Sequence, residues 1–359
     1  MSVTYAGKLS LHMPGRVRQR PAGLYNSGNT CYMNSVLQSL LHLPPLAYAL
    51  LERSTRELIG EFGGTTSGGF NPTEAMRDLA ERVLCGSNVV QPTVFQSKLK
   101  TYARTLRKGH QEDAHEFLVL LLEAMQQQCF ARADSRIDAN HALRRSTLVQ
   151  RVFSGRLRSR VSCPACRHNS DTFDPCLDLS LDIRHAKSVN EALDVFTKAE
   201  ELSGSGRDRY RCEGCRKRVN ASKRFTIDTP PLVLTVHLKR FTLTGSKLTR
   251  AIKYPYTLQL GARHLSEGVD PVTYTLHAVI HHHGGGPNSG HYVANVKAGR
   301  GPGWLSANDS TVSQAHNGKT SGEDKSCYVL FYVMDAASSS RSGALLPPHA
   351  PCSAQAPSA

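Results

Sequence analysis

Long apolar runs and internal repeats are both missing from this sequence of 359 residues. A membrane-crossing helix needs roughly 20 consecutive apolar residues, and no run in the chain approaches that length. Collagen-like, coiled-coil and wholly disordered chains are excluded by composition, since 40% of the residues are hydrophobic and 20% are charged. We therefore expect an intracellular, globular protein with one large folded domain or two modest ones, without a secretory signal or a membrane partner.

Acidic residues are scarce relative to basic ones. Lysine and arginine number 44 and aspartate and glutamate 29, which gives a net charge of +15. Such an excess favours an anionic partner or a compartment rich in nucleic acid, and it says nothing about the fold. The basic residues are scattered, so the sequence predicts a solvated basic surface with at most weak nucleic-acid contact. We expect a location in the nucleus or nucleolus, or in the cytoplasm.

The chain divides into a folded stretch with two polar ends. Residues 1–20 are basic and lack periodicity, which predicts a flexible leader. Residues 336–359 are rich in serine, alanine and proline, which predicts a disordered tail. Between them, residues 21–335 show no linker and form one predicted domain.

Periodicity predicts helices early in this domain and strands later. Apolar residues at helical spacing cover 33–41 and 114–125, and Ser188 with Glu191 is typical of a capping box that opens a third helix. Segments 232–241, 274–281, 291–296 and 327–333 are rich in strand-forming residues. This order favours an α+β fold with a largely antiparallel sheet.

Cys31 lies two residues before Met33, the first apolar position of the first predicted helix. The N–H groups at a helix start have no partner within the helix. They and the helix dipole lower the pKa of a thiol placed there, and they can stabilise an oxyanion on an attacked carbonyl. A lone cysteine at a helix start is more often a small buried residue, so a catalytic role requires a partner.

A candidate partner comes much later in the chain. A cysteine nucleophile gives its proton to an imidazole, whose other nitrogen is held by a third group. His291 follows the glycine-rich run 284–290, and an amide and a carboxylate follow at Asn308 and Asp309. Either of these two side chains can orient the imidazole, so both remain candidates.

Five blocks of the sequence together resemble the ubiquitin-specific protease family. In chain order they are GLYNSGNTCYMNS at 23–35, QEDAHEF at 111–117, LKRF at 238–241, GHYV at 290–293 and YVLFY at 328–332. The resemblance implies a papain-like cysteine protease fold with a helical thumb, a palm and antiparallel, zinc-tipped fingers around residues 150–230. It also implies hydrolysis of isopeptide and peptide bonds at the C-terminal glycine of ubiquitin, with ubiquitin and ubiquitinated proteins as partners.

The resemblance also implies roles for individual residues. Cys31 would be the nucleophile, His291 the general base, and Asn308 or the neighbouring Asp309 the orienting residue. Asn26 would help to form the oxyanion hole. The implied substrate-binding residues are Asp113, Gly290 and Tyr292. An asparagine in the third position can hold the imidazole but cannot stabilise imidazolium by charge, which matters less for a thiolate nucleophile.

Two Cys-x-x-Cys pairs, Cys163 with Cys166 and Cys212 with Cys215, predict a structural zinc site. Each pair can place two thiolates on one ion, and two pairs complete a tetrahedron with no open position for catalysis. The alternatives are a redox pair and unrelated core cysteines, and a redox role is disfavoured because neither pair follows a strand in a βαβ pattern. No organic cofactor is expected. The run His281–His283 is not predicted to bind metal, because neighbours on a strand point to opposite faces.

Two other functions fit parts of the sequence. One is a ubiquitin receptor of this fold without catalysis, which the complete set of catalytic residue types disfavours. The other is a zinc-containing nucleic-acid-binding protein, which the net charge favours and the lack of an aromatic-basic motif disfavours.

Overall fold

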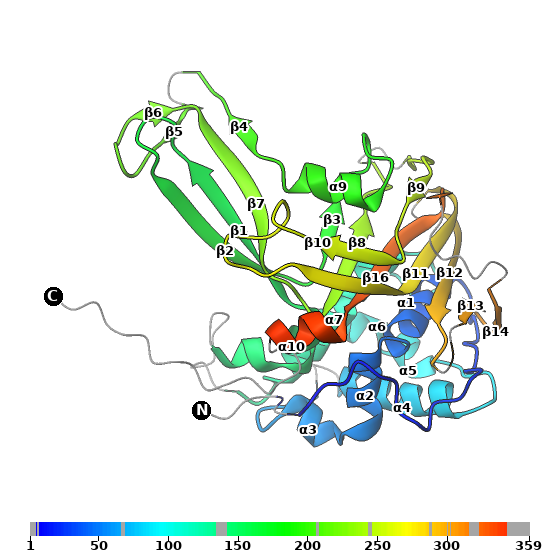
Figure 1. Cartoon of the computed structure of the whole chain (residues 1–359). Coiled ribbons are helices and arrows are strands. Elements are labelled where there is room, and N and C mark those ends of the chain that lie inside the picture. Colours follow the sequence, from blue (N-terminus) through cyan, green and yellow to red (C-terminus); the bar gives the residue numbers. More distant parts are fainter. Residues whose placement is uncertain are drawn as a thin grey trace.

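The computed structural model describes residues 5, 7–65, 69–133, 142–205, 208–242, 246–286, 289–299, 301, 303–315 and 323–342. Helices from the first half of the chain pack beneath a large sheet, and a second sheet extends away from both (Figure 1). This is the predicted α+β arrangement, with the helices as thumb, the large sheet as palm and the second sheet as fingers. Within the described residues, no helix is long and apolar enough to cross a membrane.

The thumb is built around α1, in which every residue from Cys31 to Leu41 is buried. The helix lies against β11, β12 and α7, so it is enclosed on several sides. It ends at Leu41, and the next helix begins with Pro44 and Pro45, which fit the first turn because a proline lacks the N–H that has no partner there. The helices of this region are α1 (Cys31–Leu41), α2 (Pro44–Glu52), α3 (Thr55–Ile59), α4 (Pro72–Ala80), η1 (Glu81–Cys85), α5 (Thr93–Ser97), α6 (Leu99–Tyr102), α7 (Ala114–Gln128), η2 (Ala142–Ser146) and α8 (Leu148–Phe153).

The palm is a sheet with the strand order β14-β13-β12-β11-β16-β8-β3, and β10 adds to β11. Its neighbours pair antiparallel except for β3 and β8. At its centre, β16 is buried along its whole length, as its unbroken apolar sequence requires. The strands are β3 (Leu179–Leu181), β8 (Val233–Leu238), β10 (Thr257–Leu260), β11 (Val272–Gly286), β12 (Ser289–Lys297), β13 (Trp304–Asn308), β14 (Thr311–Gln314) and β16 (Cys327–Met334).

The fingers are a four-stranded sheet with the order β2-β1-β7-β4. It reaches away from the palm and carries the short β5–β6 hairpin near its far end (Figure 1). Helix α9 (Val189–Phe196) precedes β4, and the Ser188 hydroxyl accepts a hydrogen bond from the Glu191 N–H, which is one half of the predicted capping box. The Glu191 carboxylate accepts the N–H of Lys187 in place of that of Ser188. The remaining strands are β1 (Gly155–Ser162), β2 (Asn169–Cys176), β4 (Glu200–Leu202), β5 (Tyr210–Arg211), β6 (Arg218–Val219), β7 (Ala221–Thr229), β9 (Ile252–Lys253) and β15 (Glu323–Asp324).

The two ends of the chain differ from the sequence-based expectation where the structure describes them. In the predicted flexible leader, Tyr5, Leu9 and Val17 are buried in the core. They stand four and eight residues apart among polar and basic neighbours, which is neither the full apolar stripe of a helix nor the alternation of a strand, so periodicity gave no sign of their packing. Residues Ala336–Ser342 of the predicted tail form a helix, α10. The rest of that tail, 343–359, lies outside the described residues.

Candidate active site

The loop before α1 is fixed to the turn between β13 and β14. A Cβ atom on Gly23 would lie 2.2 Å from the backbone oxygen of Ser310, so only glycine permits this approach. The next residue, Leu24, donates its N–H to the carbonyl oxygen of Asp309 at 2.8 Å. The backbone at residues 23–24, shortly before Cys31 in the sequence, is thereby packed against the backbone at residues 309–310.

Asn26 organises the loop that leads into α1. Its side-chain oxygen accepts hydrogen bonds from the N–H of Gly28 at 3.0 Å and from the N–H and hydroxyl of Thr30 at 3.2 and 3.1 Å. Its Nδ2 donates to Oδ2 of Asp309 at 2.9 Å. An amide nitrogen carries two hydrogens, so one N–H of Asn26 remains for another acceptor.

Asp309 binds a second amide, that of Asn34 in α1. Its Oδ1 accepts a hydrogen bond from Asn34 Nδ2 at 2.8 Å. Asp309 has a φ of 49°, a left-handed backbone conformation that aspartate tolerates in tight turns. The carboxylate therefore connects one residue before Cys31 to one residue after it.

Asn308, and not Asp309, contacts the imidazole of His291. The His291 Nε2 lies 2.6 Å from the Asn308 side-chain oxygen. An amide oxygen only accepts, so Nε2 carries the proton and Nδ1 has a free lone pair. Among the described residues, no hydrogen bond reaches that Nδ1. The imidazole is thus held in the tautomer that can take a proton from a thiol.

Cys31 is the first residue of α1 and is only 2% exposed. Burial raises the pKa of its thiol above the ordinary value, although the N–H groups of Tyr292 and Tyr32 lower it. The nearby carboxylate of Asp309 raises this pKa further. The predicted lowering of the Cys31 pKa is therefore wrong, because the burial of the thiolate away from water raises this pKa by more than the N–H groups at the helix start lower it. Among the described residues, no hydrogen bond joins this thiol to His291, a contact that often tightens only with substrate.

The backbone just before His291 is held by an amide side chain from the thumb. Gln111 Nε2 donates to the carbonyl oxygen of Gly290, and the N–H of Gly290 donates to Gln111 Oε1, both at 2.8 Å. Gly290 has a φ of 142°, and a Cβ there would lie 2.4 Å from the carbonyl oxygen of His283. Only glycine fits this narrow neck of the β11–β12 hairpin.

Lys247 holds the other strand of the same neck. Its Nζ donates to the carbonyl oxygens of His282 at 2.6 Å and Gly284 at 3.2 Å. The segment that carries Lys247 is fixed by the buried Arg240, whose guanidinium donates to the carbonyl oxygen of Leu248 at 2.9 Å. Two side chains from outside the sheet thus hold the hairpin that presents His291.

The other implied substrate-binding residues lie next to this neck. Asp113 caps α7 by accepting the N–H of Glu116 at 2.9 Å, and its other oxygen accepts the hydroxyl of Tyr328 at 2.5 Å. Tyr292 is buried, and its hydroxyl has no hydrogen-bond partner among the described residues. Asp113 and Tyr328 therefore connect the thumb to the centre of the palm.

Several functional contacts were missed from the sequence, although the residues stand inside the motifs. Asn34, Gln111 and Tyr328 lie within the motif blocks, but the sequence predicts no role for them. A signal was available for Asn34, because a buried amide on an otherwise apolar helix face needs a hydrogen-bond partner. Lys247 lies between motifs, and nothing in its local sequence indicates a contact with the hairpin.

His115, Asp178 and His237 form a second group whose ligand atoms lie within 4.8 Å of one another. The two imidazole rings are stacked, with centroids 3.7 Å apart and planes 11° apart. A metal ion binds in the plane of an imidazole at roughly 2.0 Å, so stacked rings cannot share one ion. The rings instead bond to Asp178 at 3.1 Å and to Ser180 at 2.7 Å, as structural histidines.

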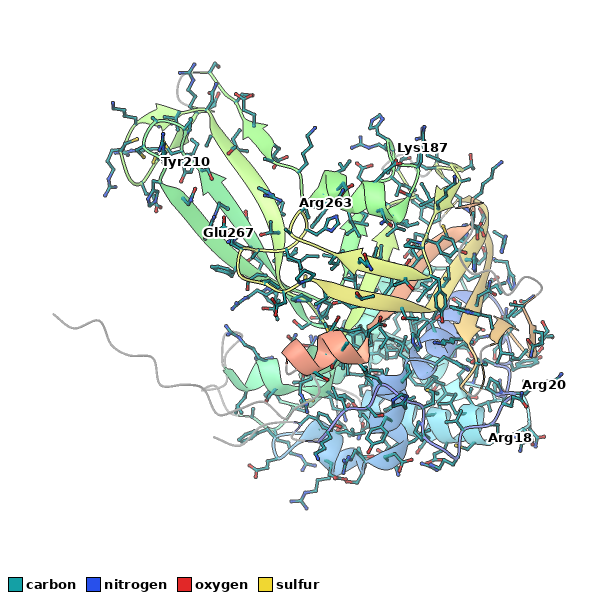
Figure 2. The ribbon with its side chains drawn as sticks, in the orientation of Figure 1. Arg18, Arg20, Lys187, Tyr210, Arg263 and Glu267 are labelled. Carbon is teal, nitrogen blue, oxygen red and sulfur yellow. The ribbon has the colours of Figure 1, made fainter. Side chains whose placement is uncertain are left out.

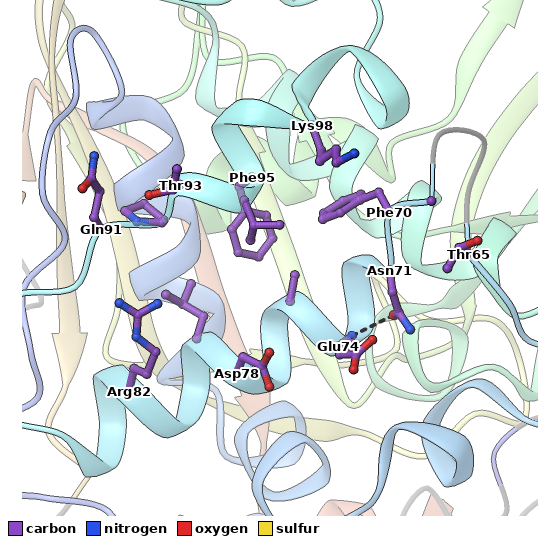
Figure 3. A pocket seen from close by; sticks show the side chains of 15 residues that line it. Thr65, Phe70, Asn71, Glu74, Asp78, Arg82, Gln91, Thr93, Phe95 and Lys98 are labelled. Atoms are coloured by element: carbon purple, nitrogen blue, oxygen red, sulfur yellow. Dashed lines mark hydrogen bonds between the residues drawn. The ribbon is translucent and has the colours of Figure 1, made fainter.

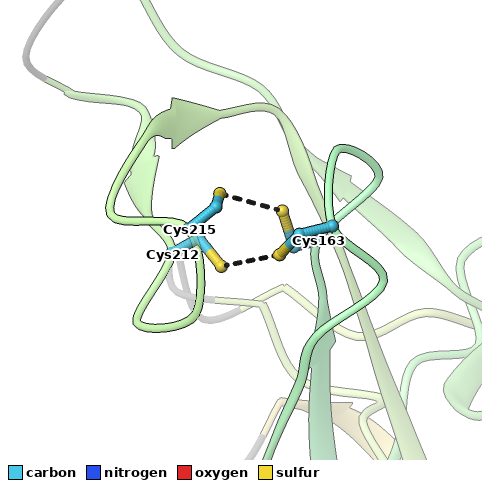
Figure 4. Close-up of side chains that lie close together, drawn as sticks. Cys163, Cys212 and Cys215 are labelled. Carbon is cyan, nitrogen blue, oxygen red and sulfur yellow. Dashed lines mark hydrogen bonds between the residues drawn. The ribbon is translucent and has the colours of Figure 1, made fainter.

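The four paired cysteines meet at the end of the fingers (Figure 4). The sulfurs of Cys163 and Cys215 are 3.9 Å apart, and those of Cys166 and Cys212 are 3.6 Å apart. These distances exclude disulfides, whose sulfurs are about 2.05 Å apart. They fit a tetrahedron of thiolates about 2.3 Å from a central zinc, in which sulfurs are roughly 3.8 Å apart. The donor set therefore suits a closed, structural zinc site.

A large hollow of about 610 Å³ lies elsewhere on the thumb, beside α4 and α5 (Figure 3). The rings of Phe70 and Phe95 form part of its wall, and Glu74 and Asp78 lie along α4. Its described lining residues include no cysteine or histidine. It therefore holds none of the predicted catalytic groups.

Comparisons with known proteins identify the family. The family model for ubiquitin carboxyl-terminal hydrolase matches residues 22–332. Human ubiquitin carboxyl-terminal hydrolase 42 is 40% identical over 315 residues, which cover 87% of this chain and 23% of that protein. Human ubiquitin carboxyl-terminal hydrolase 17-like protein 6 is 37% identical over 87% of this chain and 74% of its own length. An Arabidopsis thaliana relative, hydrolase 23, is 38% identical over 89% of this chain and 36% of its own length.

Solved structures show the same fold. The SAGA DUB module of Ubp8, Sgf11, Sus1 and Sgf73 bound to monoubiquitin matches with a TM-score of 0.73 and 28% identity, over 91% of this chain and 71% of that one. The module bound to ubiquitin aldehyde matches with a TM-score of 0.72. The chain spans 23% to 27% of the length of several curated relatives. By sequence, fold and site, it belongs to the ubiquitin carboxyl-terminal hydrolase family, that of the ubiquitin-specific proteases.

Proposed function

We propose that this chain is a cysteine-type deubiquitinase that cleaves isopeptide and peptide bonds at the C-terminal glycine of ubiquitin. The observation that carries the proposal is the His291–Asn308 contact, which leaves Nδ1 free to accept a proton, while Cys31 begins the helix that packs against β12, the strand of His291. Membership of the family and the likeness to modules solved with ubiquitin support ubiquitin as the partner. The proposed catalytic domain comprises residues 21–335.

The proposed reaction has two halves. His291 takes the proton of Cys31, and the sulfur attacks the glycine carbonyl carbon to form a tetrahedral oxyanion. The free N–H of Asn26 and N–H groups at the start of α1 stabilise that oxyanion. The carbon–nitrogen bond breaks, the leaving amine takes the proton from imidazolium, and a thioester remains. Water then attacks the thioester with His291 as base, which restores the thiol and releases the ubiquitin carboxylate.

Asn308 and Asp309 have separate roles in this proposal. Asn308 holds the imidazole in the tautomer that accepts the thiol proton. Asp309 holds the loop that carries Asn26, through the Asn26 amide and that of Asn34. Asp113, Gly290 and Tyr292 are proposed to contact the ubiquitin tail, because they surround the neck from which His291 emerges.

We also propose that Cys163, Cys166, Cys212 and Cys215 bind a structural zinc ion. Four thiolates leave no coordination position for a substrate, so the ion would join the β1–β2 turn to the β5–β6 hairpin. Backbone geometry supports the site, because Arg167 and Arg216 each have a positive φ, of 61° and 62°, that closes the two knuckles.

Location and a nucleic-acid contact are proposed from charge alone. The net charge of +15 favours the nucleus or nucleolus, with the cytoplasm as the alternative, and weak contact with nucleic acid through scattered basic residues. Filter binding to single-stranded RNA should show low affinity that falls steeply with salt. Absence of retention at low ionic strength would contradict this contact.

The deciding experiment is intact mass after incubation with ubiquitin that carries a C-terminal electrophile. Wild type and Cys85→Ala, which removes a thiol outside the site, should gain the mass of one ubiquitin, and Cys31→Ala should not. Wild type and Cys85→Ala should also release ubiquitin from a model isopeptide, and Cys31→Ala should not. If folded, zinc-loaded wild type binds ubiquitin but forms no adduct, the result would contradict the proposed enzyme and support a ubiquitin receptor without catalysis.

A further inference from the structure

A second hollow, of about 330 Å³, lies where the segment between β10 and β11 crosses the fingers. Figure 2 labels Arg263 and Glu267 on this crossing segment, in front of the fingers strands. The segment is attached to β7, since Leu265 forms a β-bridge with Ile227. The wall of the hollow includes Arg158 and Arg160 of β1, Arg224 and Thr226 of β7, and Ser266 and Glu267 of the segment. We call it the arginine hollow.

The strand register places its basic residues on one face. Arg158 is paired with Thr226, and Arg160 with Arg224, across β1 and β7. Directly paired residues share a sheet face, and like charges placed this way are destabilising. The sheet therefore brings positive charges together on the face that lines the hollow. A bound anion would offset the repulsion between them.

Only one of the three guanidinium groups has a carboxylate in a close pair. Arg160 binds both oxygens of Asp171, at 2.8 and 2.7 Å. Arg224 instead donates to the carbonyl oxygens of Thr197 at 2.9 Å and Arg263 at 2.7 Å. Glu267 lies 3.4 Å from Arg160, but its side chain is 85% exposed. Among the described residues, no carboxylate forms an ion pair with Arg158 or Arg224. The hydrogen bond from Arg160 lowers the pKa of the Asp171 carboxyl, and Arg158 adds to this lowering only through its charge.

Arg158 contributes a donor that lacks an acceptor. Its Nε is buried, and it has no hydrogen-bond partner among the described residues. A buried N–H without an acceptor is destabilising, and more so on a charged group, so this position calls for an acceptor such as an anion. The two hydroxyls beside it are also buried, since Thr226 and Ser266 are 2% and 4% exposed.

These hydroxyls supply a further donor. Thr226 Oγ1 and Ser266 Oγ are 2.9 Å apart, so one donates to the other. The hydrogen of the second hydroxyl remains for another acceptor. Guanidinium and hydroxyl donors around one hollow are the groups that bind phosphate, which accepts several strong hydrogen bonds.

We propose that the arginine hollow binds a small phosphorylated molecule, through Arg158, Arg224 and the Thr226–Ser266 hydroxyl pair. The hollow is bounded by a sheet and a crossing segment, which suits a compact ligand better than the extended backbone of a nucleic acid. A bound phosphate would connect the fingers to the segment that leads into β11. Ligand binding to the folded state alone raises its stability, so the melting temperature should rise with ligand concentration.

The test uses the whole chain with inorganic pyrophosphate and, in a separate arm, glucose 6-phosphate. Calorimetry and thermal unfolding should show binding to wild type. Arg158→Gln should bind at least about tenfold more weakly, because it lacks one strong hydrogen bond between charged groups. Stronger binding of pyrophosphate would identify a free polyanion as the ligand type, and stronger binding of the sugar phosphate would identify a phosphate ester. The experiment needs no turnover, so its outcome is independent of the proposed function.

Two further variants distinguish specific binding in the arginine hollow from non-specific attraction of anions to a basic protein. Arg184→Gln removes the same charge from the exposed Arg184–Asp182 pair and should bind like wild type. Arg158→Lys keeps the charge but removes the Nε donor, and it should also lose affinity. No binding by wild type, or equal losses in Arg158→Gln and Arg184→Gln, would overturn the proposal. Retention of full affinity in Arg158→Lys would overturn the role of Nε.

Discussion

Asn308 and Asp309 are neighbours in the chain, yet they support opposite halves of the site. The Asn308 oxygen lies 2.6 Å from His291 Nε2, whereas the Asp309 carboxylate receives the amides of Asn26 and Asn34 at 2.9 and 2.8 Å. The end of β13 therefore holds the His291 imidazole, the proposed base, and the turn after it fixes the loop before Cys31, the proposed nucleophile. Their substitution should produce different defects.

Asn308→Ala should reduce kcat/KM by roughly 100-fold or more, because general-base catalysis contributes about 10²–10⁴-fold and needs the correct tautomer. The melting temperature should stay close to that of wild type. Steady-state hydrolysis of a fluorogenic ubiquitin substrate measures the first quantity, and thermal unfolding measures the second. Asn308→Asp should retain activity, and loss of activity in that variant would contradict an orienting role.

Asp309→Asn should weaken the fold around the nucleophile. Hydrogen bonds to a charged group contribute about 1.5–3 kcal/mol, so we expect a loss of about 2 kcal/mol in the free energy of unfolding. Urea unfolding measures it, and hydrogen exchange should increase at residues 24–30. Wild-type stability and exchange, combined with lost activity, would show instead that Asp309 acts on the imidazole.

Lys247→Met should lower kcat by roughly 10-fold or more, because misplacement of a catalytic group by about 1 Å can cost 100-fold. The change removes the ammonium that binds the carbonyl oxygens of His282 and Gly284. Lys247→Arg restores a cationic donor and should recover part of the rate, with ubiquitin affinity unchanged in both. Equal kcat values in wild type and Lys247→Met would show that Lys247 does not position His291.

Zinc removal should unfold the end of the fingers and leave the reacting groups in place. Wild type should contain about one zinc ion per chain, and Cys163→Ala should contain markedly less and melt at a lower temperature. Elemental analysis and thermal unfolding measure both, and Cys129→Ala serves as a control at a buried thiol outside the cluster. Full zinc content in Cys163→Ala would contradict the ligand assignment.

Acid should destabilise the protein through His42, because burial lowers the pKa of this histidine to about 4. The unfolded chain, with an ordinary histidine pKa near 6.5, binds a proton that the folded chain excludes. Stability is therefore complete above about pH 6.5 and falls as the pH drops toward 4, by about 3 kcal/mol in total. Urea unfolding of wild type and His42→Gln between pH 4 and 7 should show a shallower pH dependence in the variant.

The sequence predicted the parts of the site that depend on local pattern. Periodicity located α1, α7 and the strand that carries His291, and the motifs located Cys31 and the paired cysteines. It left Asn308 and Asp309 open, since neighbours in a turn point in directions that only the backbone geometry decides. It also missed the packing of Tyr5, because contacts between distant segments leave no periodic signal.

The pKa of Cys31 shows the same limit. A helix start favours the thiolate, and the sequence supports that expectation. Burial acts in the opposite direction, and the pKa also depends on Tyr292 of β12 and on Asp309, which lie far from Cys31 in the sequence. The balance between these two effects is therefore a property of the folded chain.

The joining of Gly23 to Ser310 also has a consequence for synthesis on the ribosome. The nucleophile emerges early and the turn that anchors its loop emerges late, since 283 residues separate Asn26 from Asp309. Contacts of such long sequence separation form slowly and late. A nascent chain, or one cut before β13, therefore carries Cys31 without Asn308 to orient His291 and without the Asp309 anchor. Under the proposed function, the order of translation would keep the chain inactive until almost the whole domain has been made.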